Sequence, residues 1–252
     1  MKIRFLALLL LTLPAACHHR LPDLPGQEVS PGPLVQALDA QRHKLVTVKA
    51  VARVETERKG RRRSYESVAI VMNSSGKLRV DGFGPLGESL FALLSDGRTV
   101  LLRPPGEEEF ISVGQAGLER ALGVSLSPGE LCAALGGNVI APQTEVPVRA
   151  ACETAGRCMV QFSEGGAVRR VHVFRPSGEP ADRGLADSEE RYDGDRLVYR
   201  GRFEGRRSIS GYSFPMTVVL ENPDRALRLT VLYEEVEING PVEETIFQGD
   251  MQ

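Results

Sequence analysis

The stretch LVTVKAVARVETERKGRRRSYESVAIVM, residues 45–72, decides the fold class because its side chains alternate with a period of two. Apolar residues at every second position of 46–54 face one way, and Thr47, Lys49, Arg53 and Glu55 face the other, as in a strand with one buried face. A basic turn at 58–63 leads into a second segment in which apolar residues alternate over 68–72. The stretch therefore predicts an antiparallel β-hairpin.

Outward from this hairpin, short strand patterns separated by turn residues continue along the chain. Hairpin spacing without long helices excludes a parallel βαβ architecture. The polar stretch 175–190 is expected to be a loop, and one domain is expected over 34–252. Further strands are predicted at 77–81, 90–94, 99–103, 109–113, 159–162, 168–174, 196–203, 214–221, 226–233 and 236–238, and short helices at 34–43, 115–122 and 128–135.

The composition is that of an ordinary folded domain. The chain has 252 residues, of which 42% are hydrophobic and 25% charged, so it can bury a core. Its 31 Lys and Arg against 33 Asp and Glu give a net charge of −2. With no basic excess, nucleic acid is not expected as a partner.

The first residues have the pattern of an export signal. Lys2 and Arg4 precede the apolar run 5–13, and small residues precede Cys17. This pattern predicts a signal peptide over 1–16, too short to span a bilayer. The segment LTLPAAC resembles the lipobox of bacterial lipoproteins, which implies lipidation of Cys17; the alternative is an ordinary signal with a chance cysteine.

The segment that follows is expected to be a tether. Residues 17–33 carry four prolines and no periodic apolar pattern, so they are predicted to be semi-extended. By resemblance to enteric lipoproteins, which carry Asp after the lipidated cysteine when they are retained at the inner membrane, His18 implies the outer membrane.

Motifs for covalent chemistry are missing from the sequence. The segment GFGPLG at 82–87 fits the dinucleotide pattern, but only 88–95 separates it from the next turn, which leaves no room for the helix that such a site needs. His43 and His172 are the only histidines of the predicted domain, too few to argue for a zinc or catalytic cluster. We therefore expect no enzyme activity, no metal and no cofactor.

Two other features leave alternatives open. Five of the six residues 58–63 are basic, which fits either a solvated hairpin tip or contact with anionic lipid head groups or an acidic partner. Cys152 and Cys158 flank a plausible hairpin turn, and a bond between them would leave Cys132 as a buried thiol; three reduced cysteines are the alternative.

The segment 77–139 resembles the LolB family of outer-membrane lipoproteins. A strand running into Pro-Leu-Gly, an apolar strand, Asp-Gly, another strand and a two-helix stretch are shared, and the closing strands of 214–239 resemble the wider LolA/LolB-like group. The resemblance implies a mainly β fold with short helices: a curved, incomplete antiparallel barrel with a helical lid. This chain departs from the family in having no Trp and in carrying the long 175–190 segment.

The resemblance also implies a function. In this family an apolar cavity receives the acyl chains of lipoproteins from a periplasmic LolA-like carrier and delivers them to the outer membrane. The protruding Leu that assists insertion corresponds to Leu86, within Gly84, Pro85, Leu86 and Gly87; the alternative is that Leu86 caps the core.

The cavity is expected on the concave face of the half-barrel, where small alanines leave space. We expect a monomer on the periplasmic face of the outer membrane. The alternative is a structural or regulatory lipoprotein that uses the same fold to bind a protein. The candidate cavity residues are Val48, Ala50, Ala52, Val54, Val68, Ile70 and Met216.

Overall fold

A computed structural model describes residues 24, 26–140, 146–154, 156–164, 167–174 and 184–248. The predicted signal peptide and Cys17 lie outside these residues. The three α-helices of the described part are α1 (Gly32–His43), α2 (Gly114–Leu122) and α3 (Pro128–Leu135). Its strands are β1 (Gln27–Glu28), β2 (Thr47–Arg58), β3 (Arg61–Asn73), β4 (Lys77–Phe83), β5 (Ser89–Asp96), β6 (Val100–Arg103), β7 (Ile111–Ser112), β8 (Val146–Cys152), β9 (Arg157–Glu164), β10 (Ala167–Phe174), β11 (Leu185–Asp193), β12 (Arg196–Ile209), β13 (Tyr212–Asn222) and β14 (Leu227–Ile238).

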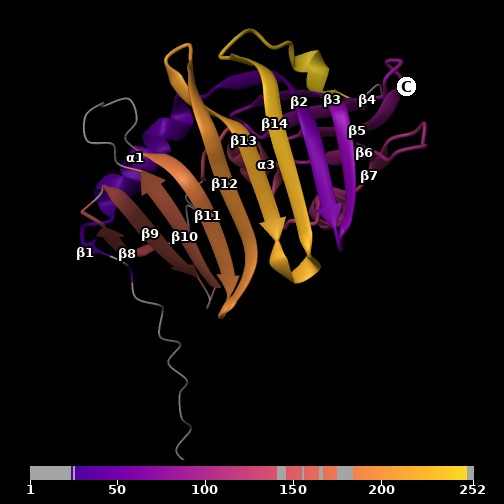
Figure 1. Cartoon of the computed structure of the whole chain (residues 1–252). Helices are drawn as coiled ribbons and strands as arrows, with labels where there is room; N and C mark the ends of the chain where they lie inside the picture. The colour runs from indigo at the N-terminus through magenta and orange to yellow at the C-terminus, as the bar shows by residue number, and fades with distance from the viewer. Residues whose placement is uncertain are drawn as a thin grey trace, which may run out of the picture.

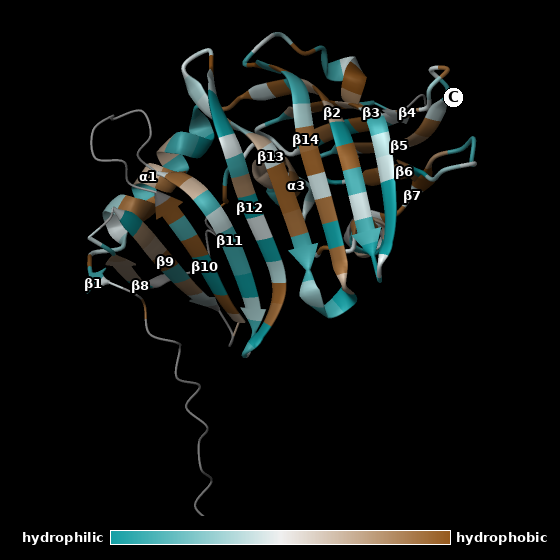
Figure 2. Cartoon of the chain, in the orientation of Figure 1, coloured by the Kyte–Doolittle hydropathy of each residue, from teal (hydrophilic) through white to brown (hydrophobic). Residues whose placement is uncertain are grey.

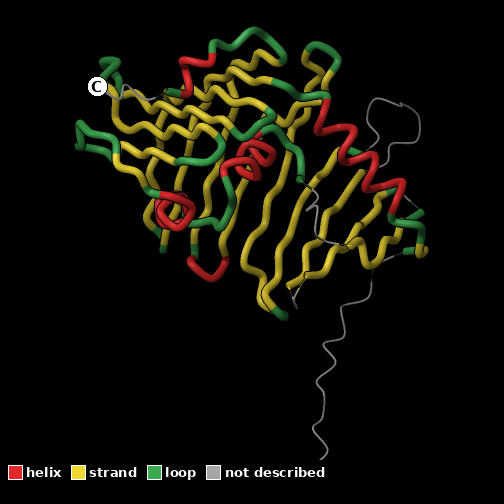
Figure 3. Tube along the Cα trace, turned by 180° about the vertical axis from the view of Figure 1, so that it is seen from behind, coloured by secondary structure: helices red, strands yellow, loops and turns green. Residues whose placement is uncertain are grey.

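Within the described ranges, all strands form one antiparallel sheet in the order β1-β8-β9-β10-β11-β12-β13-β14-β2-β3-β4-β5-β6-β7. The chain's N-terminal hairpin β2–β3 therefore pairs with the C-terminal strand β14, which places it in the middle of the sheet. No pairing joins β7 to β1 among the described residues, so the barrel stays open. The sheet curves around α2 and α3 (Figure 1). These helices lie in front of the sheet in Figure 3, which shows the molecule from behind. The predicted incomplete antiparallel barrel with short helices is confirmed.

Apolar and polar residues alternate along the strands (Figure 2), and because successive side chains point to opposite sides, this alternation gives the sheet two different faces. Along β2, Val48, Ala50, Ala52 and Val54 are buried on the concave side while the intervening residues are partly exposed. This face packs on the helices and forms the core with the inward residues of β3 and β14. Each large apolar side chain buried there contributes about 1.5–3 kcal/mol to stability.

Helix α3 has the bounds that the sequence predicts. Pro128 at its first turn has a fixed φ that suits a helix start, and Ser127 caps it. The Ser127 side chain accepts from the backbone N–H of Glu130, and the Glu130 carboxylate accepts from the backbone N–H of Ser127, 2.8 Å away. This reciprocal capping satisfies two backbone donors at the helix N-terminus.

The structure differs from the predicted elements in the second half of the chain. The loop predicted over 175–190 is wrong from Leu185 onward, because β11 begins there. β11 was missed because its sequence, LADSEERYD, is polar; its charged side chains are balanced by arginines of the neighbouring strands. β8 was not predicted. The segments predicted as two strands at 226–238 form the single strand β14, with a bulge near Tyr233.

The predicted tether also differs in its C-terminal part. β1 pairs with β8, and the backbone N–H of Val29 donates to the carbonyl of Ala150, 2.9 Å away. Leu24 is buried, and α1 begins at Gly32. Prolines near this strand suggested a free tether, but an edge strand tolerates them because only one of its sides is paired.

Candidate functional site

An apolar pocket of about 570 Å³ lies between the concave side of the sheet and the helices α2 and α3. Its volume is within the range of about 300–1,000 Å³ that is usual for small-molecule sites. Strands β2–β6 and β14 form the wall, and the helices contribute four side chains. The lining consists of Val54, Thr56, Arg58, Arg61, Arg63, Tyr65, Ile70, Val80, Phe91, Leu93, Leu102, Pro104, Pro105, Ala121, Leu122, Leu131, Leu135, Leu227, Leu229 and Val231.

A bulge between β2 and β3 shapes one end of this wall. Ala52 pairs with Val68, but Val54 pairs with Tyr65, so β3 has one more residue than β2 in between. Because side chains alternate along a strand, this extra residue changes which positions face the pocket. Ile70, which follows the bulge in the chain, faces the pocket. Arg61, Arg63 and Tyr65, which precede the bulge, face it too.

Gly82, within β4, has a packing role at this wall. A Cβ on Gly82 would lie 2.1 Å from Cε1 of Phe91, so only glycine leaves room for that ring. The Phe91 ring lies edge-on to Tyr65, with 4.9 Å between ring centroids. Both aromatic side chains line the pocket, and neither was a predicted cavity residue.

Hydrogen bonds attach the helices to the sheet at several points. The Tyr233 hydroxyl donates to the carbonyl of Leu135, 2.8 Å away, and the Asn222 amide donates to the carbonyl of Gly123, 2.9 Å away. An ion pair joins Glu130 of α3 to Arg191 of β11 at 2.8 Å. Burial alone would raise the pKa of Glu130, but the Arg191 guanidinium and the hydrogen bonds from Ser127 together outweigh it and hold the pKa below its ordinary value.

A cavity of about 810 Å³ lined by several charged residues lies between the sheet and the other side of α2 and α3. Arg169 lines it and is buried with Glu189, with 2.5 Å between Nε and Oε1, and Arg191 Nε lies 3.0 Å from the same oxygen. Burying charges is costly unless they are paired, and here two arginines share one glutamate, with Glu130 beside them. The concave face thus has an apolar half and a charged half, and acyl chains suit only the former.

Of the predicted cavity residues, Val54 and Ile70 line the large pocket. Ala50, Ala52 and Val68 are buried on the same face but do not line it, and Met216 is partly buried against the core. Ala50 and Ala52 lie farther along β2 from the pocket than Val54, whereas Val68 lies in β3 between two residues that line it. The pocket residues that the prediction missed include Leu102, Leu122, Leu229 and Val231; the alternation of Leu227, Leu229 and Val231 in β14 was the signal available in the sequence.

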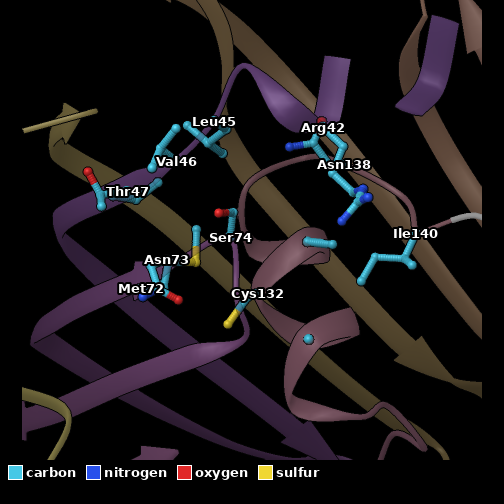
Figure 4. Close-up of a pocket in the computed structure, with 13 residues that line it drawn as sticks. Arg42, Leu45, Val46, Thr47, Met72, Asn73, Ser74, Cys132, Asn138 and Ile140 are labelled. Carbon is cyan, nitrogen blue, oxygen red and sulfur yellow. The ribbon is translucent and has the colours of Figure 1, made fainter. Parts of the chain in front are cut away.

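Val48 lines a second, much smaller cavity between the start of β2 and helix α3 (Figure 4). It holds about 30 Å³, which is space for about one water molecule and not for an acyl chain. Cys132 on α3 and Met72 line it together. The Cys132 Sγ lies 3.6 Å from the carbonyl oxygen of Lys77.

Cys132 should be inert in the folded protein. Its burial raises the pKa of the thiol to about 12, so the reactive thiolate is scarce at neutral pH. In a chain carrying Cys17→Ser, we expect a chromogenic disulfide reagent to release no coloured product before denaturation. After denaturation it should detect one reactive thiol per chain. Rapid labelling of the native protein would show that this helix face opens. The pair Cys152 and Cys158 is joined by a disulfide and serves as the unlabelled control.

The loop between β4 and β5 exposes one large apolar side chain. Leu86 is 95% exposed, which excludes the alternative that it caps the core. Glu88 holds the loop: its carboxylate accepts from the backbone N–H of Leu86, and its carbonyl accepts from that of Gly84, 2.8 Å away. Gly87 has a φ of 82°, which favours glycine. The strands that flank this loop contribute Val80 and Phe91 to the pocket.

Two features are absent from the described residues. No group of three or more His, Cys, Asp or Glu side chains that could hold a metal ion is found among them. None of the helices in the described ranges is both long and apolar enough to cross a membrane.

Solved structures share this fold. A LolA superfamily protein from Nitrosomonas europaea superposes with a TM-score of 0.61 at 13% identity, covering 88% of this chain and 99% of its own. A Vibrio parahaemolyticus domain described as an outer membrane lipoprotein-sorting protein has a TM-score of 0.58 at 10% identity, covering 85% and 94%. A DUF1329 family protein from Desulfovibrio piger has a TM-score of 0.55 at 13% identity, also covering 85% and 94%. At these identities the likeness shows the fold alone.

Neither a family model nor a curated protein matches the chain.

Proposed function

We propose that this protein is a lipoprotein of the outer membrane that holds acyl chains in its apolar pocket and inserts other lipoproteins into that membrane. The observation that carries the proposal is the pocket of about 570 Å³ whose wall strands lead directly to an exposed leucine. One of the structural neighbours is described as an outer membrane lipoprotein-sorting domain, which agrees with this proposal.

The pocket would stabilise acyl chains by removing them from water. Each buried methylene contributes about 0.8 kcal/mol, so a chain of several methylenes binds without any covalent step. Transfer then requires only that the affinity for the chain rises from a periplasmic LolA-like carrier to this protein and on to the membrane. Leu86 would enter the bilayer surface beside the pocket and shorten the path over which a chain is exposed to water.

The anchor would keep this loop near the membrane. We propose that Cys17 is lipidated after removal of residues 1–16, as the lipobox implies. Since Leu24 is already buried in the fold, the chain from Cys17 to Leu24 can span at most about 25 Å. At this distance, an exposed side chain of the folded domain can reach the bilayer while Cys17 stays anchored in the same membrane.

A transfer assay tests the proposal. A LolA-like carrier loaded with a fluorescent lipoprotein is mixed with vesicles that carry this protein or lack it. We expect label to reach the vesicles that carry the protein several times faster. Equal rates for the two kinds of vesicle, with acyl binding intact, would contradict insertion and favour a lipoprotein that only binds lipid or a partner.

A further inference from the structure

Three arginines lie on the wall of the apolar pocket. Arg58 ends β2, and Arg61 and Arg63 begin β3, so all three belong to one hairpin. All three are exposed, in contrast to the buried Leu229 and Val231 that line the same pocket. The bulge brings Arg61 and Arg63 to this side together with Tyr65, and Arg58 faces the same side from β2, so the arginines lie at the open end of an apolar cavity.

The arginines have no partner that would neutralise them. Their backbones pair within the sheet, but in the described part of the chain no hydrogen bond or ion pair reaches the side chains of Arg58, Arg61 or Arg63, and no Asp or Glu lines the pocket. Arg62, on the opposite face of the same hairpin, is instead paired with Glu55 at 2.5 Å. Three like charges around one opening repel one another, and an anion bound among them would relieve the repulsion.

We propose that Arg58, Arg61 and Arg63 form a head-group site, and that the pocket takes an anionic glycerophospholipid with its phosphate among the three guanidinium groups. Guanidinium binds phosphate oxygens in a bidentate manner and is the usual side chain for this purpose. The acyl chains of the same molecule would lie along Leu229 and Val231. This inference rests on the proposed binding of acyl chains and adds the class of ligand.

The position of the arginines favours a lipid over an acidic protein. An acidic protein surface could bind any of the charges on the hairpin tip, including Lys59 and Arg62, which lie outside the pocket. The unpaired arginines share their cavity with apolar side chains from β14 and from both helices, which an amphiphile with one charged end would fill. The acylated cysteine of a lipoprotein has no phosphate. The three arginines would therefore bind the head group of a phospholipid and add nothing to the binding of a lipoprotein's acyl chains.

Competition binding tests the inference on the full chain with Cys17→Ser, which carries no acyl chains of its own. A fluorescent uncharged acyl probe is displaced by dioctanoyl-phosphatidylglycerol or by dioctanoylglycerol, which has the same chains and no phosphate. We expect the phosphatidylglycerol to bind at least about tenfold more tightly, with an advantage that falls as salt screens the exposed charges. The double variant R61Q/R63Q should lose this advantage and bind dioctanoylglycerol as before.

The control is K59Q/R62Q, which removes two charges from the same tip outside the pocket and should behave as the wild type. An unchanged preference for phosphatidylglycerol in R61Q/R63Q would overturn the head-group site and leave the pocket in place. Failure of the wild type to bind the uncharged probe would overturn the proposed function itself. Loss of a co-purifying acidic protein from R61Q/R63Q, with lipid preference intact, would also overturn the inference and assign the arginines to a protein contact.

Discussion

Val54→Phe should lower the affinity for a long-chain acyl probe by about tenfold or more. Val54 is buried in β2 and lines the pocket, so the larger ring would occupy space that an acyl chain needs. Excluding about two methylenes, at about 0.8 kcal/mol each, corresponds to a loss of about tenfold. The measurement is a titration of a fluorescent fatty acyl probe into the purified protein.

The same substitution on the other face of the strand is the control. Val51 lies three residues earlier in β2, where the alternation turns its side chain away from the pocket. Val51→Phe should bind the probe as the wild type does.

Because an open pocket accepts the added ring, Val54→Phe should change the free energy of unfolding by less than about 1 kcal/mol. Full affinity in Val54→Phe would show that acyl chains bind elsewhere.

Leu86→Glu should impair insertion into membranes without altering stability. The side chain is 95% exposed, so replacing it removes almost no packing. Entry of one leucine into the apolar part of a bilayer is worth about 1.5–3 kcal/mol, which corresponds to a loss of about tenfold to a hundredfold in transfer. The measurement is the rate of lipoprotein transfer to vesicles, with thermal unfolding of the same variant recorded in parallel.

Two further variants separate insertion from general surface hydrophobicity. Leu86→Phe keeps a large apolar side chain on the loop and should transfer as the wild type does. Ile111→Glu removes another exposed apolar side chain, on β7, and should also leave transfer intact. Normal transfer by Leu86→Glu would contradict the insertion role, and a defect in Ile111→Glu would show that the effect is not specific to the loop.

The fold could be predicted from the sequence where one face of each strand is apolar. The alternation through 46–54 and 68–72 predicts the central hairpin, and the short helix predicted at 128–135 has the bounds of α3. β11 escaped prediction because its inward side chains are charged, and their burial depends on arginines from β10, distant contacts that no local pattern reveals. β1 is stabilised by pairing with β8, which is likewise invisible locally.

The site was predictable only in part, for a similar reason. Alternation identifies which side chains face inward, but not which of them border an open space. Val54 and Ile70 line the pocket, while Ala52 and Val68, on the same face, do not. The bulge that turns Arg61 and Arg63 into the pocket also reverses the parity of β3, so a uniform period of two would have assigned these arginines to the outer face.

Photo-crosslinking with a diazirine-bearing fatty acyl chain tests the central claim most directly, because it reports where the chain lies. After irradiation and proteolysis, we expect saturable labelling of one site, with labels on Leu229, Val231 and the helix residues Leu131 and Leu135 that line the same pocket. Labelling confined to the outer face of the sheet, or no saturable labelling at all, would contradict it.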